Sequence, residues 1–209
     1  MAISDLITEI RTEISDDNST RFTDAQILRV LQKAIRRANR IAQRNGLQFA
    51  KKLAELTTTA NQAYLTLSSS ITDFDVLIGM WRTDLHQKIK LRTEEEWESI
   101  VSASVLEYAY FDYANDKIRF KDTPSGATTI DCWYYPTVTS SSYTTGASSP
   151  WGGRLDDIIM EYTGNRLKNI DEMDLTLDTQ LMTDFENQIL QAYAANANTQ
   201  AEGKGWTGL

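Results

Sequence analysis

The sequence predicts an α+β protein in which the two ends of the chain form a small helical bundle and a β-rich, antiparallel subdomain is inserted between them. Three observations support this fold class. Apolar residues recur at helical spacing near both ends, the middle alternates apolar with polar residues, and turn-forming Asn, Gly and Pro separate the alternating segments. We therefore expect a bundle from 1–48 and 151–199, an inserted subdomain from 49–150, and a flexible C-terminal tail from 200–209.

The composition is typical of a globular protein. A chain of 209 residues buries roughly 70% of its unfolded surface. No apolar run approaches the ~20 residues that span a bilayer, and the N-terminus lacks a secretory pattern, so we expect neither membrane insertion nor secretion. The single cysteine, Cys132, excludes an internal disulfide, and its apolar surroundings predict a buried thiol.

The first expected element is a short helix from Ser4 to Ser15. Ser4 is its predicted N-cap, because a serine hydroxyl accepts hydrogen bonds from first-turn amides. Apolar residues at helical spacing give it one buried face: Leu6, Ile7, Ile10 and Ile14. A turn at 16–20 follows.

A long helix is expected from Arg21 to Gly46, with signals at both ends. Thr23 and Gln26 have the spacing of a capping box, and Phe22 is placed to pack on Ile27 as a hydrophobic staple. Gly46 supplies the left-handed residue that closes a helix.

One face of this long helix is basic. At about 100° per residue the apolar residues share one arc and the basic residues lie opposite. The basic residues are Arg29, Lys33, Arg36, Arg37, Arg40 and Arg44. Between Arg21 and Lys52 there are nine basic residues and one acidic, although the whole chain has a net charge of -8. This asymmetry leaves three interpretations open: a solvated face, a protein interface between a basic and an acidic surface, or a nucleic-acid contact.

The middle of the chain is expected to form strands joined by short turns. Leu53–Thr59 and Ala63–Leu67 predict a hairpin around Asn61-Gln62, and strands are expected at Val76–Arg82 and Lys88–Leu91. Thr93 and Glu96 repeat the capping-box spacing and begin a short acidic helix that ends near Ile100. A three-stranded meander is predicted from the segments Leu106–Tyr113, Lys117–Lys121 and Thr128–Val138.

After the strands, a Ser/Thr-rich loop at 139–149 is expected to be a flexible excursion. Helical spacing then returns, first from Leu155 to Leu167 and then from Leu177 to Tyr193. Tyr143 and Trp151 are aromatic residues in loops, which makes them candidate contacts at an interface unless they fold back on the chain.

The sequence offers no set of residues for catalysis. Residues 203–208 match a dinucleotide fingerprint letter by letter but lack the strand and helix that this motif needs. His86 is the only histidine and lies in the predicted hairpin turn 83–87. One histidine and one cysteine exclude the usual zinc sets, and the acidic clusters lack the spacing of a calcium loop. We therefore predict no catalytic residue, no metal site and no cofactor.

Several segments resemble the head-to-tail adaptor (connector) proteins of tailed bacteriophages. The resemblance is strongest where the long helix begins, at Arg21-Phe22-Thr23-Asp24-Ala25-Gln26-Ile27-Leu28. It continues in family order through Lys117-Ile118-Arg119-Phe120, Cys132-Trp133-Tyr134-Tyr135-Pro136 and Leu155-Asp156-Asp157-Ile158-Ile159. Ile71-Thr72-Asp73-Phe74 lacks the proline found there in many adaptors.

The resemblance implies a non-enzymatic ring, typically a dodecamer, at the head-tail junction of a virion, made in the cytoplasm of a bacterial host. The ring would bind the portal protein on one side and a tail or stopper (nozzle) protein on the other, while genomic DNA passes through its channel. A C-terminal tail that reaches into the portal is a recurrent family feature. This suggests Lys204, Trp206 and Leu209 as the portal anchor, and the basic face of the long helix as a contact with a neighbouring subunit or partner.

Two alternatives remain. A stopper or tail-completion protein of the same junction differs only in its partner. A helix-turn-helix-like DNA-binding regulator would place the basic face on phosphates, but the segment after the long helix is β-type where a third helix is expected, and the net charge of -8 opposes binding to DNA.

Overall fold

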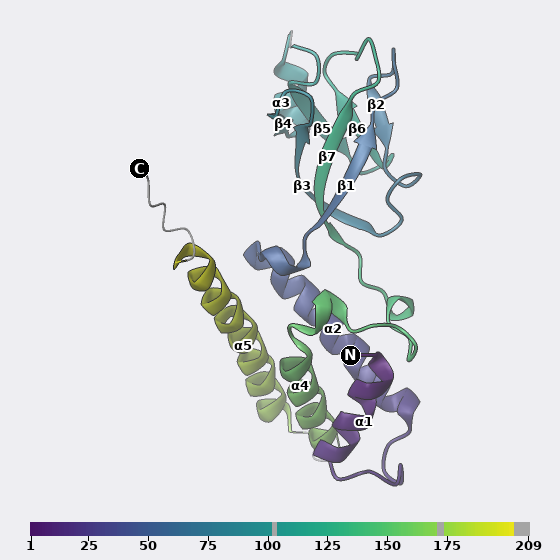
Figure 1. Ribbon diagram of the computed structural model, residues 1–209, viewed down its shortest axis with the longest axis vertical. Coiled ribbons are helices and arrows are strands. Elements are labelled where there is room, and N and C mark those ends of the chain that lie inside the picture. Colours follow the sequence, from purple (N-terminus) through teal and green to yellow (C-terminus); the bar gives the residue numbers. More distant parts are fainter. Residues whose placement is uncertain (102–103, 171–173, 203–209) are drawn as a thin grey trace. The chain divides into compact units, whose positions relative to one another are not determined.

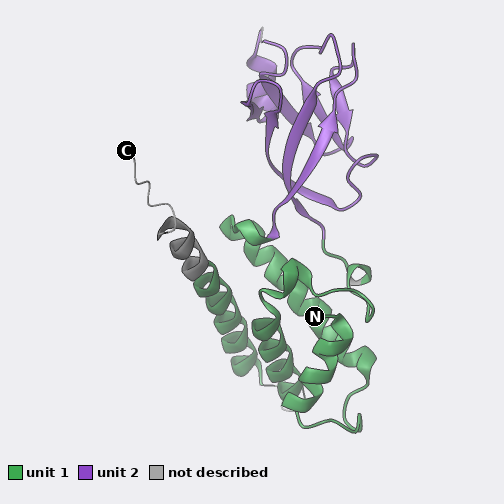
Figure 2. Ribbon diagram, in the orientation of Figure 1, with its two compact units in different colours: residues 1–49, 138–209 green, residues 50–137 purple. Residues whose placement is uncertain are grey.

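A computed structural model describes residues 1–101, 104–170 and 174–202, in which five α-helices and seven strands occur. The predicted mixture of helix and sheet is therefore confirmed. Contacts divide the chain into two compact units (Figure 2): a helical unit, Met1–Phe49 with Val138–Leu209, and a sheet unit, Ala50–Thr137. Among the described residues, no helix has the length and apolar character needed to span a bilayer.

The helical unit is organised around α4, which contacts each of the other helices of the unit. The helices are α1 (Ile3–Glu13), α2 (Asp24–Asn45), α4 (Asp156–Asn169) and α5 (Leu175–Glu202), shown in Figure 1. Gly164 permits the close approach of α1, because a Cβ atom at this position would lie 2.9 Å from Oε1 of Glu13. A larger residue would therefore displace the Glu13 carboxylate.

The predicted ends of α2 are confirmed. The Gln26 amide donates to Thr23 Oγ1 at 3.3 Å, and the Thr23 amide donates to Gln26 Oε1 at 2.8 Å, which completes the capping box. Gly46 has φ 68°, the left-handed conformation expected at the C-terminus. Arg11 and Asp16 brace the preceding turn through a buried ion pair of 3.0 Å.

The start of α1 differs from the prediction. The helix begins at Ile3, and Ser4 is not its cap. The amides of Ile3 and Ser4 donate instead to the carbonyls of Ala147 and Thr145, at 2.9 and 3.1 Å. The Ser/Thr-rich loop, predicted to be a flexible excursion, is thus held against α1, because the unpaired amides of a first helical turn require acceptors and this loop supplies them.

The sheet unit contains a curled sheet whose seven strands, within the described residues, follow the order β1-β7-β3-β4-β5-β6-β2. The strands are β1 (Lys52–Thr57), β2 (Tyr64–Thr66), β3 (Phe74–Arg82), β4 (Gln87–Arg92), β5 (Tyr108–Asp112), β6 (Lys117–Phe120) and β7 (Thr129–Pro136). Neighbours are antiparallel except β4 and β5, which are parallel and are connected through α3 (Glu94–Ser99). The capping box predicted for α3 is confirmed.

Two predicted strand pairings are wrong. Strands β1 and β2 do not form a hairpin, because β1 pairs with β7 and β2 pairs with β6. The expected meander also breaks after β6, since β7 leaves it to lie between β1 and β3. Side chains on one face of β7, including Cys132 and Tyr134, are buried in the core of the sheet unit with Met80 and Ile118. The hairpin between β3 and β4 is confirmed, with His86 exposed at its turn.

At the C-terminal end, α5 continues through Glu202, although the sequence placed 200–202 in the tail. Residues 203–209, and with them Lys204, Trp206 and Leu209, lie outside the described residues.

Candidate functional site

The candidate site is the basic face of α2, and the folding of this helix explains its position. The apolar arc of α2 is buried in the helical unit, as the periodicity predicts. Its buried apolar residues are Ile27, Leu31, Ala34, Ile35, Ala38, Ile41 and Ala42. On the opposite arc, Arg29, Lys33, Arg40 and Arg44 are exposed, and Arg36 and Arg37 are half-buried.

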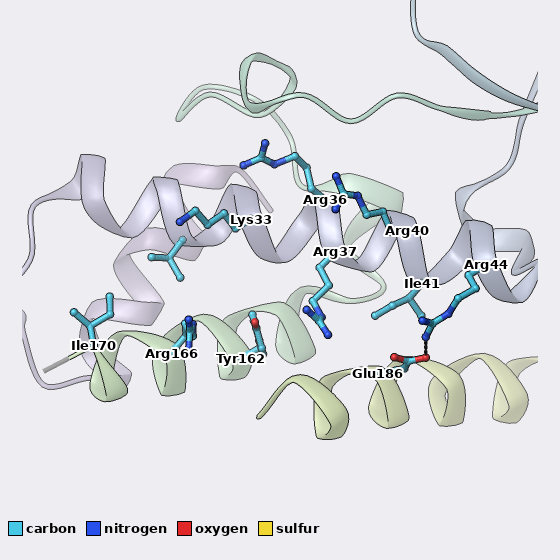
Figure 3. A pocket seen from close by; sticks show the side chains of 11 residues that line it. Lys33, Arg36, Arg37, Arg40, Ile41, Arg44, Tyr162, Arg166, Ile170 and Glu186 are labelled. Carbon is cyan, nitrogen blue, oxygen red and sulfur yellow. Dashed lines mark hydrogen bonds and ion pairs between the residues drawn. The ribbon is translucent and has the colours of Figure 1, made fainter. Parts of the chain in front are cut away.

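An open groove of about 690 Å³ runs along this face between α2, α4 and α5 (Figure 3). Its walls are strongly basic. Six cationic side chains line it, namely Lys33, Arg36, Arg37, Arg40 and Arg44 of α2 and Arg166 of α4. Among the described lining residues Glu186 is the one acid, and Val30, Ile41, Tyr162 and Ile170 supply an apolar surface. Arg29 belongs to the same face of α2 but does not line the groove.

Helix α5 engages three of these cations. Arg44 forms an ion pair with Glu186, and Arg166 forms one with Asp178. Arg37 Nη1 donates to Met182 Sδ at 2.9 Å, while its buried Nε has no hydrogen-bond partner among the described residues. These three side chains therefore contribute to the packing of α5 on the helical unit.

The other cations of the groove have no acidic partner in the part of the chain that the structure describes. Lys33 and Arg40 make no hydrogen bond or ion pair with any described residue, and Arg36 Nε contacts only the carbonyl of Gln32 on its own helix, at 3.4 Å. Figure 3 shows Arg36 and Arg40 directed away from α4, whereas Arg37 extends toward it. Lys33, Arg36 and Arg40, hereafter the free triad, thus leave positive charge available to an anionic partner.

The two predicted loop contacts both touch their own unit. The Trp151 ring packs edge-on against Phe49, with ring centroids 5.2 Å apart. The Tyr143 carbonyl accepts a hydrogen bond of 2.8 Å from Gln32 Nε2. Both side chains remain half-exposed.

Other polar groups singled out in the sequence have structural roles. Asp16 accepts hydrogen bonds from the backbone amides of Arg21, Phe22 and Thr20, and the Arg21 bond is the largest contribution to lowering its pKa. Burial raises the pKa of the Cys132 thiol to about 12, which keeps the thiol protonated. Within the described ranges, no three His, Cys, Asp or Glu side chains gather in a way that would hold a metal ion.

Sequence reasoning missed Arg166, Glu186 and Asp178 as parts of this site. Each belongs to a helix whose existence was predicted, but the side of that helix which meets α2 depends on tertiary packing. A search for charged residues one turn from an apolar helix face would have marked them as candidates.

A family model described as SU10 adaptor protein matches residues 1–204, which include the whole sheet unit and the helical unit up to residue 204. No curated protein matches the chain.

Proposed function

The chain belongs to the SU10 adaptor protein family, a family of phage head-to-tail adaptors, and we propose that it forms a ring between the portal protein and the tail. Membership identifies it as a structural adaptor protein of a phage. In the proposed ring, typically of twelve copies, the helices of the helical unit form the bundle, and genomic DNA passes through the central channel without sequence-specific binding.

The charge distribution supports this arrangement. Outside the basic stretch from Arg21 to Lys52, the chain carries a large excess of acidic residues. An acidic channel wall repels phosphate, because affinity for DNA comes mainly from cations that neutralise it. The free triad would then face a protein. Its lack of an acidic partner among the residues that the structure describes is the observation that carries this part of the proposal.

A second contact is proposed at the C-terminus. Helix α5 leads into 203–209, which contains Lys204, Trp206 and Leu209. Large apolar side chains such as Trp and Leu gain binding energy when they order in a pocket of a partner. We assign the segment 203–209 to the portal, and Tyr143 and Trp151 to weaker contacts with a neighbouring subunit.

The test is to mix the full chain with the portal protein of the same phage and to measure the mass of the complex. The proposal expects a ring of several copies on each portal. Removal of 203–209 should weaken portal binding by at least tenfold, while a truncated chain that binds undiminished would contradict the anchor. Addition of the tail-side protein distinguishes an adaptor from a stopper, because a stopper binds an adaptor in place of the portal.

Binding to duplex DNA separates the adaptor from a DNA-binding regulator. A regulator that neutralises several phosphates loses affinity steeply as salt rises. For an adaptor we expect little affinity at any salt concentration, so tight binding with a steep salt dependence would favour the regulator.

A further inference from the structure

Helix α3 of the sheet unit presents negative charge that its own surroundings leave unpaired. Glu95 and Glu98 are exposed, and neither makes a hydrogen bond or ion pair with a described residue. On the other side of α3, Trp97 packs beside Tyr110, and Lys121 Nζ lies 5.1 Å from its ring centre. Because Trp97 fixes α3 on the sheet, Glu95 and Glu98 lie side by side on its outer face, three residues apart.

Several acidic side chains of the helical unit already have cationic partners. Glu13 pairs with Lys168, Asp24 with Arg11, Asp178 with Arg166 and Glu186 with Arg44. Among the described residues, no helix other than α3 places two unpartnered carboxylates one turn apart. Among the described helices, α3 is therefore the strongest acidic counterpart to the basic groove.

The two surfaces match in spacing as well as in charge. Lys33, Arg36 and Arg40 follow one another at intervals of about one turn along α2, and Glu95 and Glu98 repeat at the same interval along α3.

We propose that α3 of one copy binds the basic groove of the next copy, with Glu95 and Glu98 against the free triad. This inference rests on the proposed ring and deepens it. The groove and α3 are different surfaces of the same chain, and a contact between different surfaces repeats from copy to copy and closes into a ring when the rotation permits.

Charge reversal tests the contact. The groove variant carries Lys33→Glu and Arg40→Glu, and the helix variant carries Glu95→Lys and Glu98→Lys. A matched control for the helix variant, Glu55→Lys with Asp122→Lys, makes the same change in the charge of the sheet unit at other exposed positions. Each full-length variant is mixed with the portal protein, and ring formation is followed by mass. We expect at least a tenfold loss of assembly for the groove and helix variants and none for the control.

Mixing the two variants asks whether the contact joins different copies. In an alternating ring every reversed groove faces a reversed helix, and every unchanged groove faces an unchanged helix, so the mixture should assemble nearly as the wild type does. If the contact lies within one chain, only the combination of all four substitutions in a single chain restores assembly. That result would overturn the proposal.

Other outcomes are equally distinct. A helix variant that assembles like the control overturns the role of α3. If only the groove variant then loses assembly, the groove binds another partner and the proposed function stands. Failure of the wild type to form a ring overturns both. Circular dichroism verifies that each variant folds. If the helix variant does not fold, the milder variant Glu95→Gln with Glu98→Gln replaces it and should show a smaller loss of assembly.

Discussion

Replacement of Phe185 by Ala is expected to release α5 from the helical unit. Phe185 is only 1% exposed, and its ring centre lies 4.3 Å from that of Tyr162 on α4. Among the described side chains of α5, only Phe185 and Ile189 are fully buried. Most of the apolar attachment of α5 therefore depends on these two residues.

The magnitude follows from the size of the side chain and from its surroundings. A buried Phe→Ala substitution costs about 3–5 kcal/mol. The lower end applies here, because an open cleft lined by Leu181 and Gln188 lies beside Phe185 and lets the site relax. A loss of about 3 kcal/mol changes the ratio of attached to detached α5 by a factor of about a hundred.

Hydrogen exchange measures this ratio directly, since amides of a detached helix exchange faster. In F185A, peptides from 175–193 should exchange about a hundredfold faster, while peptides from α1 should change little. Leu175→Ala is the control, because Leu175 is 79% exposed and its truncation should leave the exchange of α5 unaltered. Exchange of α5 at the wild-type rate in F185A would refute the assignment of Phe185 as its anchor.

Three further predictions concern the cap, a carboxylate and the cysteine. Thr23→Ala should lower the free energy of unfolding of the helical unit by about 1 kcal/mol, measured by urea denaturation, because it removes the hydroxyl that caps α2. Burial alone would raise the pKa of Asp73, but hydrogen bonds from Lys52 and Tyr134 lower this pKa below 3.8. The ionised carboxylate therefore stabilises the fold fully at pH values well above 3.8. This stabilisation is lost as the pH falls through the lowered pKa. Urea unfolding at pH 6 and at pH 3, which lies below the ordinary value of 3.8, should show a smaller loss of stability for Asp73→Asn than for the wild type. Cys132, with a pKa of about 12, should not react with a thiol reagent at pH 8 until the sheet unit unfolds, so rapid labelling of the native protein would contradict its burial.

Local interactions made the ends of α2 and α3 predictable. A capping box joins residues three positions apart, and the left-handed Gly46 acts within one turn, so both are visible in a short stretch of sequence. The start of α1 was not predictable in this way. Its amides find acceptors at Thr145 and Ala147, more than 140 residues away, and no local pattern contains that information.

The strand pairings failed for a related reason. Alternation of apolar and polar residues shows that a segment is a strand with one buried face, but it does not identify the strand with which that segment pairs. The turn at Asn61-Gln62 suggested that β1 and β2 pair, whereas Leu53 lies opposite Trp133 and Leu65 lies opposite Ile118. The long apolar β7 offers two hydrogen-bonding edges and a buried face. On one edge β1 pairs with it in preference to β2, and on the other edge β3 pairs with it in addition to β4.

The basic face of α2 shows how much of a binding site a helical pattern can predict. Periodicity placed all six cations on one arc and gave no reason to separate them. Packing of α5 separates them, because Glu186 and Met182 meet Arg44 and Arg37 on one side of the arc and leave Arg36 and Arg40 on the other. Substitutions at Arg37 or Arg44 would therefore alter the packing of α5 together with any interface, while Lys33 and Arg40, which have no partner among the described residues, report on binding alone.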